Sequence, residues 1–234
     1  MIRWALVIWL GWAGSVAGQC RQALALALDV SGSVDAREYR LQLDGLALAL
    51  DDAQVRAALT ANPAAPVRLM VFEWSGPEDQ VVLVPWTAVT GPGVIDGIIA
   101  TLRGTARREA SPGTGLGTAM QRGTAELGRQ GDCWRRTLDI SGDGKSNLGP
   151  RPRDVKPGVA AAGVTVNGLV IGADNPDIGD LRQTEIGELS AYFRAEVIVG
   201  ADAFVETALG YDDYADAMTV KLLRELDGLV LSRR

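Results

Sequence analysis

Apolar residues along this chain alternate between short uninterrupted runs and longer stretches with helical spacing. Runs of this length, bounded by Gly, Pro, Ser or Asp, are typical of buried β-strands. The predicted strands are Leu24–Leu28, Val67–Trp74, Val81–Trp86, Arg136–Ser141, Val164–Ile171 and Glu196–Val199.

Between these runs, apolar residues recur at every third or fourth position, which predicts helices that are covered on one face. The first such stretch carries Tyr39, Leu43, Leu46 and Leu50, and Ser33 or Asp35 can cap its N-terminus. The other predicted helices are Val94–Leu102, Leu116–Arg129, Arg153–Ala162, Leu181–Arg194 and a closing helix with Tyr214, Met218, Leu222 and Leu226.

Strands that alternate with helices predict an α/β fold, a doubly wound and mostly parallel central sheet with helices on both faces. The turn at residues 75–79 joins two of the predicted strands as a hairpin, so one edge strand is expected to be antiparallel. We find no internal repeat and no boundary that would divide residues 20–234 into two domains.

Residues 1–19 have the pattern of a secretory signal peptide. Arg3 gives a positive start, Trp4–Trp12 is a short apolar core, and Ser15 and Ala17 are small residues before a cleavage point. A retained N-terminal anchor is the alternative. The mature chain contains no other stretch suited to spanning a bilayer, so we expect a secreted or periplasmic protein.

Export to an oxidising compartment makes the two cysteines informative. Cys20 comes just before the first strand, and Cys133 just before Arg136–Ser141. If these strands are parallel neighbours, both cysteines lie at the same end of the sheet, within reach of one another. We therefore predict a Cys20–Cys133 disulfide, with two free buried thiols as the alternative.

Composition excludes several classes of function. The 234 residues carry a net charge of −6, which disfavours non-specific nucleic-acid binding. The sequence contains no histidine. A Ser-His-Asp triad, a Cys-His pair and His-ligated zinc are therefore impossible within this chain.

One carboxylate and two hydroxyls follow the first strand at alternating positions, in Asp29, Ser31 and Ser33. The carboxyl ends of strands in an open α/β sheet are where ligands bind. Oxygen donors alone suit a hard cation, Mg²⁺ above all, or Mn²⁺ or Ca²⁺. The alternative is a Ser/Gly turn with an Asp cap.

Two more polar loops follow along the chain, Pro112–Gly115 and Ser141–Gly144. The three loops, in this order, resemble the metal-ion-dependent adhesion site (MIDAS) of the von Willebrand factor A domain. The resemblance implies that a divalent cation is held, and that a protein ligand completes its coordination with a carboxylate. The residues that it assigns to the metal are Asp29, Ser31, Ser33, Thr114 and Asp143.

Further segments resemble an uncharacterised bacterial family of exported, von Willebrand factor A-like proteins of unknown function. These segments are Glu73–Gly76, Pro85–Thr87, Asp139–Gly144 and Tyr211–Asp216. The resemblance covers nearly the whole mature chain. It implies the fold and the metal site, and says little about the partner.

Two assignments around the expected site stay open at this stage. Asp143 is favoured over Asp139 as the second carboxylate, because Asp143 ends its strand whereas Asp139 falls inside it and is expected to bind neighbouring backbone. Glu73 and Trp74 could form a rim around the metal, although a core tryptophan is the alternative. The Arg103, Arg107 and Arg108 cluster is expected to be a solvated loop, with a contact for an acidic partner as the alternative.

These patterns favour an exported, non-enzymatic module that binds a protein partner through a divalent cation. One alternative is a Mg²⁺-dependent phosphatase, but such enzymes need a second Asp where this chain has Ser31, and only Lys145 offers the required lysine. Another alternative is a scaffold whose metal site is vestigial.

Overall fold

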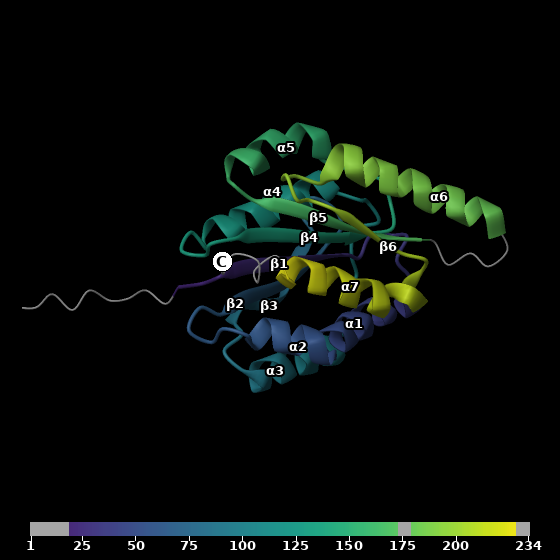
Figure 1. Cartoon of the computed structure of the whole chain (residues 1–234). Coiled ribbons are helices and arrows are strands. Elements are labelled where there is room, and N and C mark those ends of the chain that lie inside the picture. The colour runs from purple at the N-terminus through teal and green to yellow at the C-terminus, as the bar shows by residue number, and fades with distance from the viewer. Residues whose placement is uncertain (1–18, 173–178, 228–234) are drawn as a thin grey trace, which may run out of the picture.

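The computed structural model describes residues 19–172 and 179–227 and contains a central sheet between two layers of helices (Figure 1). In chain order the elements are β1 (Gln22–Asp29), α1 (Ala36–Asp51), α2 (Ala53–Thr60), β2 (Val67–Trp74), β3 (Gln80–Ala88), α3 (Pro92–Gly104), α4 (Leu116–Gly128), β4 (Arg136–Gly142), α5 (Pro152–Ala161), β5 (Thr165–Ile171), α6 (Gly179–Tyr192), the π-helix η2 (Phe193–Val197), β6 (Val205–Ala208), the 3-10 turn η3 (Tyr211–Asp213) and α7 (Tyr214–Asp227).

The sheet has six strands in the order β3-β2-β1-β4-β5-β6. Every neighbouring pair is parallel except β2 and β3, which form the expected antiparallel hairpin at one edge. The predicted fold class, a doubly wound and mostly parallel sheet with one antiparallel edge strand, is therefore confirmed.

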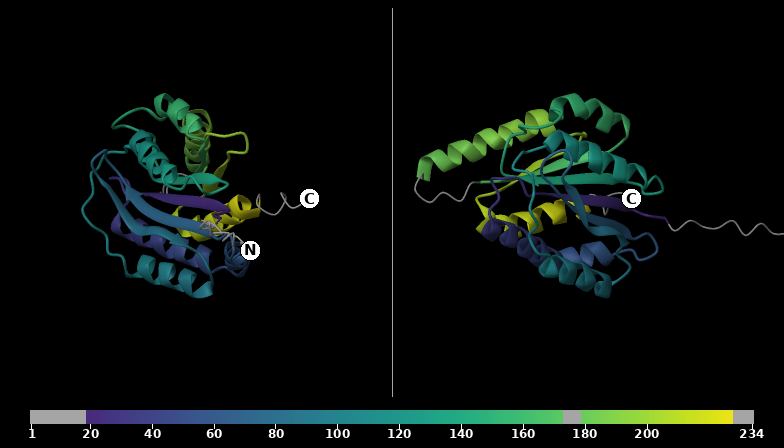
Figure 2. Two further views of the ribbon diagram at one scale, coloured as in Figure 1. Left: turned by 90° about the vertical axis from the view of Figure 1, so that its left-hand side faces the viewer. Right: turned by 180° about the vertical axis from the view of Figure 1, so that it is seen from behind.

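Strand β1 shows how the sequence sets the two layers apart. Its leucines, at 24, 26 and 28, join the core beneath α1, α3 and α7, whereas its alanines, at 23, 25 and 27, join the core beneath α4 and η2. Figures 1 and 2 show these helices on opposite faces of the sheet. Full burial of one leucine side chain contributes about 1.5–3 kcal/mol. Because β1 buries side chains against both helix layers, it stabilises the packing of both on the sheet.

The C-terminal ends of β1 and β4 lie where open α/β sheets bind ligands. Strands β1 and β4 are adjacent in the sheet, and the chain leaves them toward opposite faces and opposite edges, which makes this pair the topological switch point. Leu28 is paired with Ser141, so Asp29 lies beside Gly142 and the polar loop that follows it.

The opposite end of the same two strands carries the disulfide. Cys20 and Cys133 form a bridge with their Cα atoms 4.3 Å apart. The residues form an isolated parallel pair just before β1 and β4. The predicted Cys20–Cys133 disulfide is confirmed, because the assumed strand adjacency is correct.

The last strand was assigned to the wrong segment. Residues Glu196–Val199 were expected to be the edge strand, but Phe193–Val197 form a π-helix and the edge strand is β6. Val197 is apolar because it packs onto the sheet from the end of this helix, and Val199 makes only an isolated antiparallel bridge with Val166 of β5. Helix α2 is not predicted from the sequence, because it is short and buries only Val55 and Leu59.

The predicted signal peptide lies outside the described residues except for position 19. Within the described part of the chain, no helix has the length and apolar character needed to cross a membrane.

Candidate metal centre

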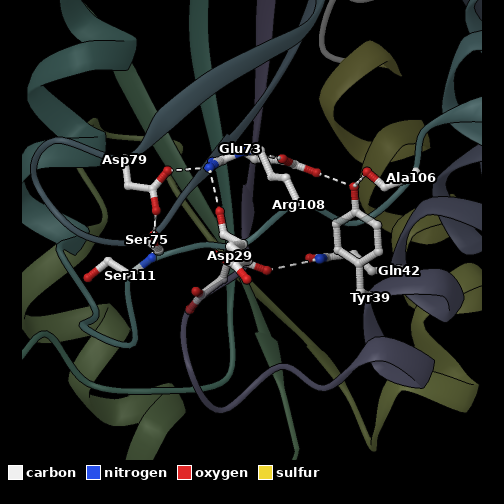
Figure 3. A network of polar contacts seen from close by, with 10 residues as sticks. Asp29, Tyr39, Gln42, Glu73, Ser75, Asp79, Ala106, Arg108 and Ser111 are labelled. Carbon is white, nitrogen blue, oxygen red and sulfur yellow. Dashed lines mark hydrogen bonds and ion pairs between the residues drawn. The ribbon is translucent and has the colours of Figure 1, made fainter.

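Asp29 ends β1 inside the protein, with its side chain fully buried. Its Oδ1 accepts a hydrogen bond of 2.8 Å from the Ser31 amide. Its carbonyl accepts one of 3.0 Å from Gln42 Nε2 on α1 (Figure 3). Its Oδ2 has no hydrogen-bond partner among the described residues. A side chain on Gly142 would come within 3.2 Å of this oxygen, so the glycine keeps the space beside it open.

Two hydroxyls join Asp29 to the loop after β4. Ser31 Oγ lies 3.3 Å from Ser33 Oγ, which in turn donates a hydrogen bond of 2.6 Å to Asp143 Oδ1. Tyr211 Oη, from the turn before α7, donates to Asp143 Oδ2 at 3.3 Å. Four of the five predicted metal residues thus form one chain of polar contacts across the β1–β4 switch point.

The fifth residue, Thr114, approaches from the segment between α3 and α4. Its amide donates to Asn147 Oδ1 at 2.8 Å, and its carbonyl accepts from the Asn147 amide at 3.0 Å. Thr114 Oγ1 lies 3.9 Å from the position that a Cβ on Gly144 would occupy. The hydroxyl therefore faces the turn that carries Asp143.

The pKa values of both carboxyl groups are raised. Burial, together with the nearby Asp143 charge, raises the pKa of Asp29 to about 8. Burial also raises the pKa of Asp143, although hydrogen bonds from Ser33 and Tyr211 oppose the rise. Ionising the buried Asp29 beside Asp143, which is only partly buried, is costly unless a positive charge joins them.

A divalent cation fits this donor set. The buried, unpartnered Asp29 Oδ2 and the hydroxyls of Ser31, Ser33 and Thr114 are all oxygen donors, which Mg²⁺ and Mn²⁺ prefer. No group of three or more Asp, Glu, His or Cys side chains suited to a metal occurs among the described residues. A centre with two carboxylates leaves the cation electrophilic toward an outside anion.

Asp139 lies apart from this centre. We expected it to bind neighbouring backbone, but its Oδ1 instead lies 2.7 Å from Lys221 Nζ, which is itself 2.7 Å from Glu225 Oε1. All three side chains are buried, and Lys221 and Glu225 belong to α7. The backbone expectation was wrong because strand alternation turns Asp139 toward the helix layer, where a cation on α7 meets it.

The suggestion that Glu73 and Trp74 form an exposed rim is also wrong. Their exposed fractions are 1% and 0%. They belong to β2, an inner strand covered by helices on both faces, so residues at its end remain in the core. The Trp74 indole N–H has no hydrogen-bond partner among the described residues.

Three residues that position the centre are not predictable from the sequence, namely Gln42, Asn147 and Tyr211. Their contacts join residues 13, 33 and 68 positions apart, so local spacing carries no signal for them. Tyr211 lay within a segment quoted for the family resemblance, but nothing in that segment pointed to Asp143.

Comparison with protein-family models shows to which family this chain belongs. A family model described as protein of unknown function (DUF1194) matches residues 19–230. The chain belongs to the DUF1194 family. None of the curated protein sequences compared with this DUF1194 chain matches it.

Solved structures show which fold this DUF1194 member has. The proximal thread matrix protein 1 of the mussel byssus, with a zinc-occupied MIDAS motif, matches with a TM-score of 0.62 and 18% identity over 89% of this chain and 48% of that one. A von Willebrand factor type A protein from Catenulispora acidiphila gives 0.58 and 13% over 88% and 43%. The pilus adhesin SpaC from Lactobacillus rhamnosus GG, in its open conformation, gives 0.57 and 14% over 91% and 30%.

The predicted von Willebrand factor A-like fold is thereby confirmed. At these identities the likeness shows the fold alone. The chain spans less than half the length of each of these three solved chains.

Proposed function

We propose that this chain is an exported protein-binding module that uses a divalent cation to capture a carboxylate of its partner. The observation that carries the proposal is the buried Asp29 Oδ2, which lacks a partner among the described residues and sits beside Asp143 and two serine hydroxyls. A buried acceptor of this kind is destabilising unless something satisfies it.

In this proposal, Asp29, Ser31, Ser33, Thr114 and Asp143 hold Mg²⁺ or Mn²⁺. The bound cation supplies a positive, exchangeable coordination position that accepts an acidic group. The residues of the chain hold their oxygens in place around it, through Gln42, Asn147 and Tyr211. The zinc-occupied MIDAS motif of the mussel byssus protein supports a divalent cation in a fold of this type.

The surface around the centre has the character of a contact site. Leu148 and Leu209 are 43% and 60% exposed, and both lie on loops at the carboxyl edge of the sheet. A cavity of about 250 Å³ adjoins Asp143, with Ile171, Ile186 and Leu189 among its lining residues. We infer a partner that presents an acidic side chain flanked by aliphatic ones.

Binding, not catalysis, is the role we propose for the centre. The sequence has no histidine, and Lys145, the one lysine that a phosphatase mechanism could use, lies 3.7 Å from Glu188. A Mg²⁺-dependent phosphatase would hydrolyse p-nitrophenyl phosphate. We expect no hydrolysis above that of the Asp29→Ala variant.

We further propose that the chain works in the periplasm or the extracellular medium. The N-terminal pattern, the disulfide and the likeness to a byssus matrix protein and a pilus adhesin support this location. Detection of the mature N-terminus in the envelope or the medium would test it.

The binding role is tested with immobilised mature protein exposed to envelope proteins, in Mg²⁺ and in EDTA. Any captured protein is then purified and its binding measured against wild type and Ser33→Ala. We expect binding by the wild type in Mg²⁺ alone. Equal affinity in Mg²⁺ and EDTA would overturn the mechanism.

A further inference from the structure

Arg108 lies in residues 105–115, the segment that joins α3 to α4 and carries Thr114. This segment has no helix or strand of its own. Arg108 Nε lies 3.3 Å from Glu73 Oε2 on β2, and its Nη1 forms an ion pair with Asp79 in the β2–β3 turn (Figure 3). Its charge is therefore directed into the protein, and the expectation of a solvated loop is wrong for this arginine.

Glu73 connects Arg108 to the helix that follows the first metal loop. Its Oε1 accepts a hydrogen bond of 2.5 Å from Tyr39 Oη on α1. Gln42, three residues further along α1, holds the Asp29 carbonyl. Glu73 is only 1% exposed, and burial of a carboxylate requires compensation by charge and hydrogen bonds. Arg108 and Tyr39 provide that compensation.

Asp79 also anchors residues 105–115, through a contact separate from its ion pair with Arg108. Its Oδ2 accepts hydrogen bonds from the Ser111 amide at 2.5 Å and from Ser75 Oγ at 3.1 Å. The Ser75 carbonyl in turn accepts from the Gly115 amide at 2.6 Å. These contacts hold the backbone on both sides of Thr114.

The segment also contacts the first metal loop directly. The Gly32 amide donates a hydrogen bond of 3.2 Å to the Pro112 carbonyl. A Cβ on Gly32 would come within 3.0 Å of Pro112, so the two loops approach closely at this point. The position of residues 105–115 therefore affects where Thr114 lies relative to Ser31 and Ser33.

We propose that Arg108, through Glu73 and Asp79, is a positioning residue that sets the place of Thr114 in the metal centre. This inference rests on the proposed function. A long connection without regular structure is mobile unless side chains tie it down, and here the ties are charged and partly buried. The Glu73–Gly76 segment, which carries part of the family resemblance, therefore has a structural role in this proposal. It pairs with Arg108 through Glu73 and binds the Gly115 amide through the Ser75 carbonyl.

The test compares Arg108→Gln with Arg103→Gln, a matched control that removes the same charge from an exposed side chain at the end of α3. Mn²⁺ affinity is measured by isothermal titration calorimetry at a temperature where melting in EDTA shows each variant fully folded. Loss of an outer residue that orients metal ligands weakens metal affinity about 10- to 100-fold. We expect that loss in Arg108→Gln and a change below about twofold in the control.

A second pair of variants asks whether Arg108 acts through Thr114. In a Thr114→Ala background, Arg108→Gln is expected to weaken Mn²⁺ binding no further, because the group that it positions is gone. Additive losses would overturn the inference. If Arg108→Gln does not fold, Asp79→Asn replaces it, with the same expected loss.

The outcomes separate the two proposals. Wild-type protein that fails to bind Mn²⁺ contradicts the proposed function and the inference with it. Wild-type protein that binds Mn²⁺, with Arg108→Gln binding equally well, contradicts the inference alone.

Discussion

Metal affinity is expected to depend steeply on pH. Burial and the neighbouring Asp143 charge raise the pKa of Asp29 to about 8, so at neutral pH the metal-free carboxyl is mostly protonated. A cation must displace that proton, because carboxylate ligands bind in the ionised form. The perturbation is a change of pH from 6 to 9 at constant ionic strength.

The size of the effect follows from the pKa. At pH 7 roughly a tenth of the metal-free protein has Asp29 ionised, and at pH 6 roughly a hundredth. The apparent Kd for Mn²⁺ should therefore improve about tenfold per pH unit up to pH 7, equivalent to about 1.4 kcal/mol per unit, and level off above pH 8.

Calorimetry in two buffers of different ionisation enthalpy measures both quantities, the Kd and the number of protons released. We expect release of about one proton at pH 7 and of almost none at pH 9. A Kd that stays constant between pH 6 and 8, with no proton release, would refute the electrostatic reasoning.

The raised pKa of Asp29 also affects the stability of the metal-free protein. A carboxyl whose pKa is higher in the folded than in the unfolded state stabilises the fold below about pH 4, and this contribution is lost as pH rises toward 8. In EDTA, the melting temperature should fall over this range by more in the wild type than in Asp29→Asn. An equal pH slope in both proteins would contradict the assignment.

Three further predictions concern other parts of the molecule. Lys221→Met leaves Asp139 and Glu225 buried without their cation, so urea unfolding should show a loss of about 3–5 kcal/mol; a loss below about 1 kcal/mol would be inconsistent with the burial. Replacement of Cys20 and Cys133 by serine should lower the free energy of unfolding by about 4–5 kcal/mol in the chain-entropy model, since the bridge spans 113 positions, and an unchanged urea midpoint would argue against it. Leu209→Glu should weaken partner binding in Mg²⁺ while leaving the Kd for Mn²⁺ within about twofold; loss of metal binding would show that Leu209 acts on the centre instead.

Strands that are buried on both faces of the sheet are the ones that the sequence pattern predicts well. Strand β1 reads as an uninterrupted apolar run because leucines meet one helix layer and alanines the other. Strand β6 has only the sequence Val-Glu-Thr-Ala and is half-buried, so its pattern is weak. The stronger apolar pattern at 196–199 comes from a helix end that packs onto the sheet, which a local reading cannot distinguish from a strand.

The metal centre was predictable to the extent that it is local. Asp29, Ser31 and Ser33 lie in one loop, and their spacing suggests a hard cation without any other knowledge. Thr114 and Asp143 needed the family resemblance, because only the fold brings these segments together.

The supporting contacts could not be predicted at all. The partnership of Asp139 with Lys221 depends on which face of β4 meets α7, and that of Arg108 with Glu73 depends on how the segment before α4 crosses the sheet edge. Neither arrangement produces a periodic pattern of residues in the sequence.

The central claim is that the Asp29–Asp143 centre holds a divalent cation, and thermal melting of the mature protein tests it most directly. Wild type, Asp29→Ala and the remote surface variant Asp96→Ala are each melted in excess Mg²⁺ or Mn²⁺ and in EDTA. A cation that binds only the folded state at about 100 times its Kd adds about 2.7 kcal/mol of stability. The account predicts a metal-dependent rise in melting temperature for wild type and Asp96→Ala that is absent in Asp29→Ala. The same melting temperature in metal and EDTA for all three proteins would contradict it.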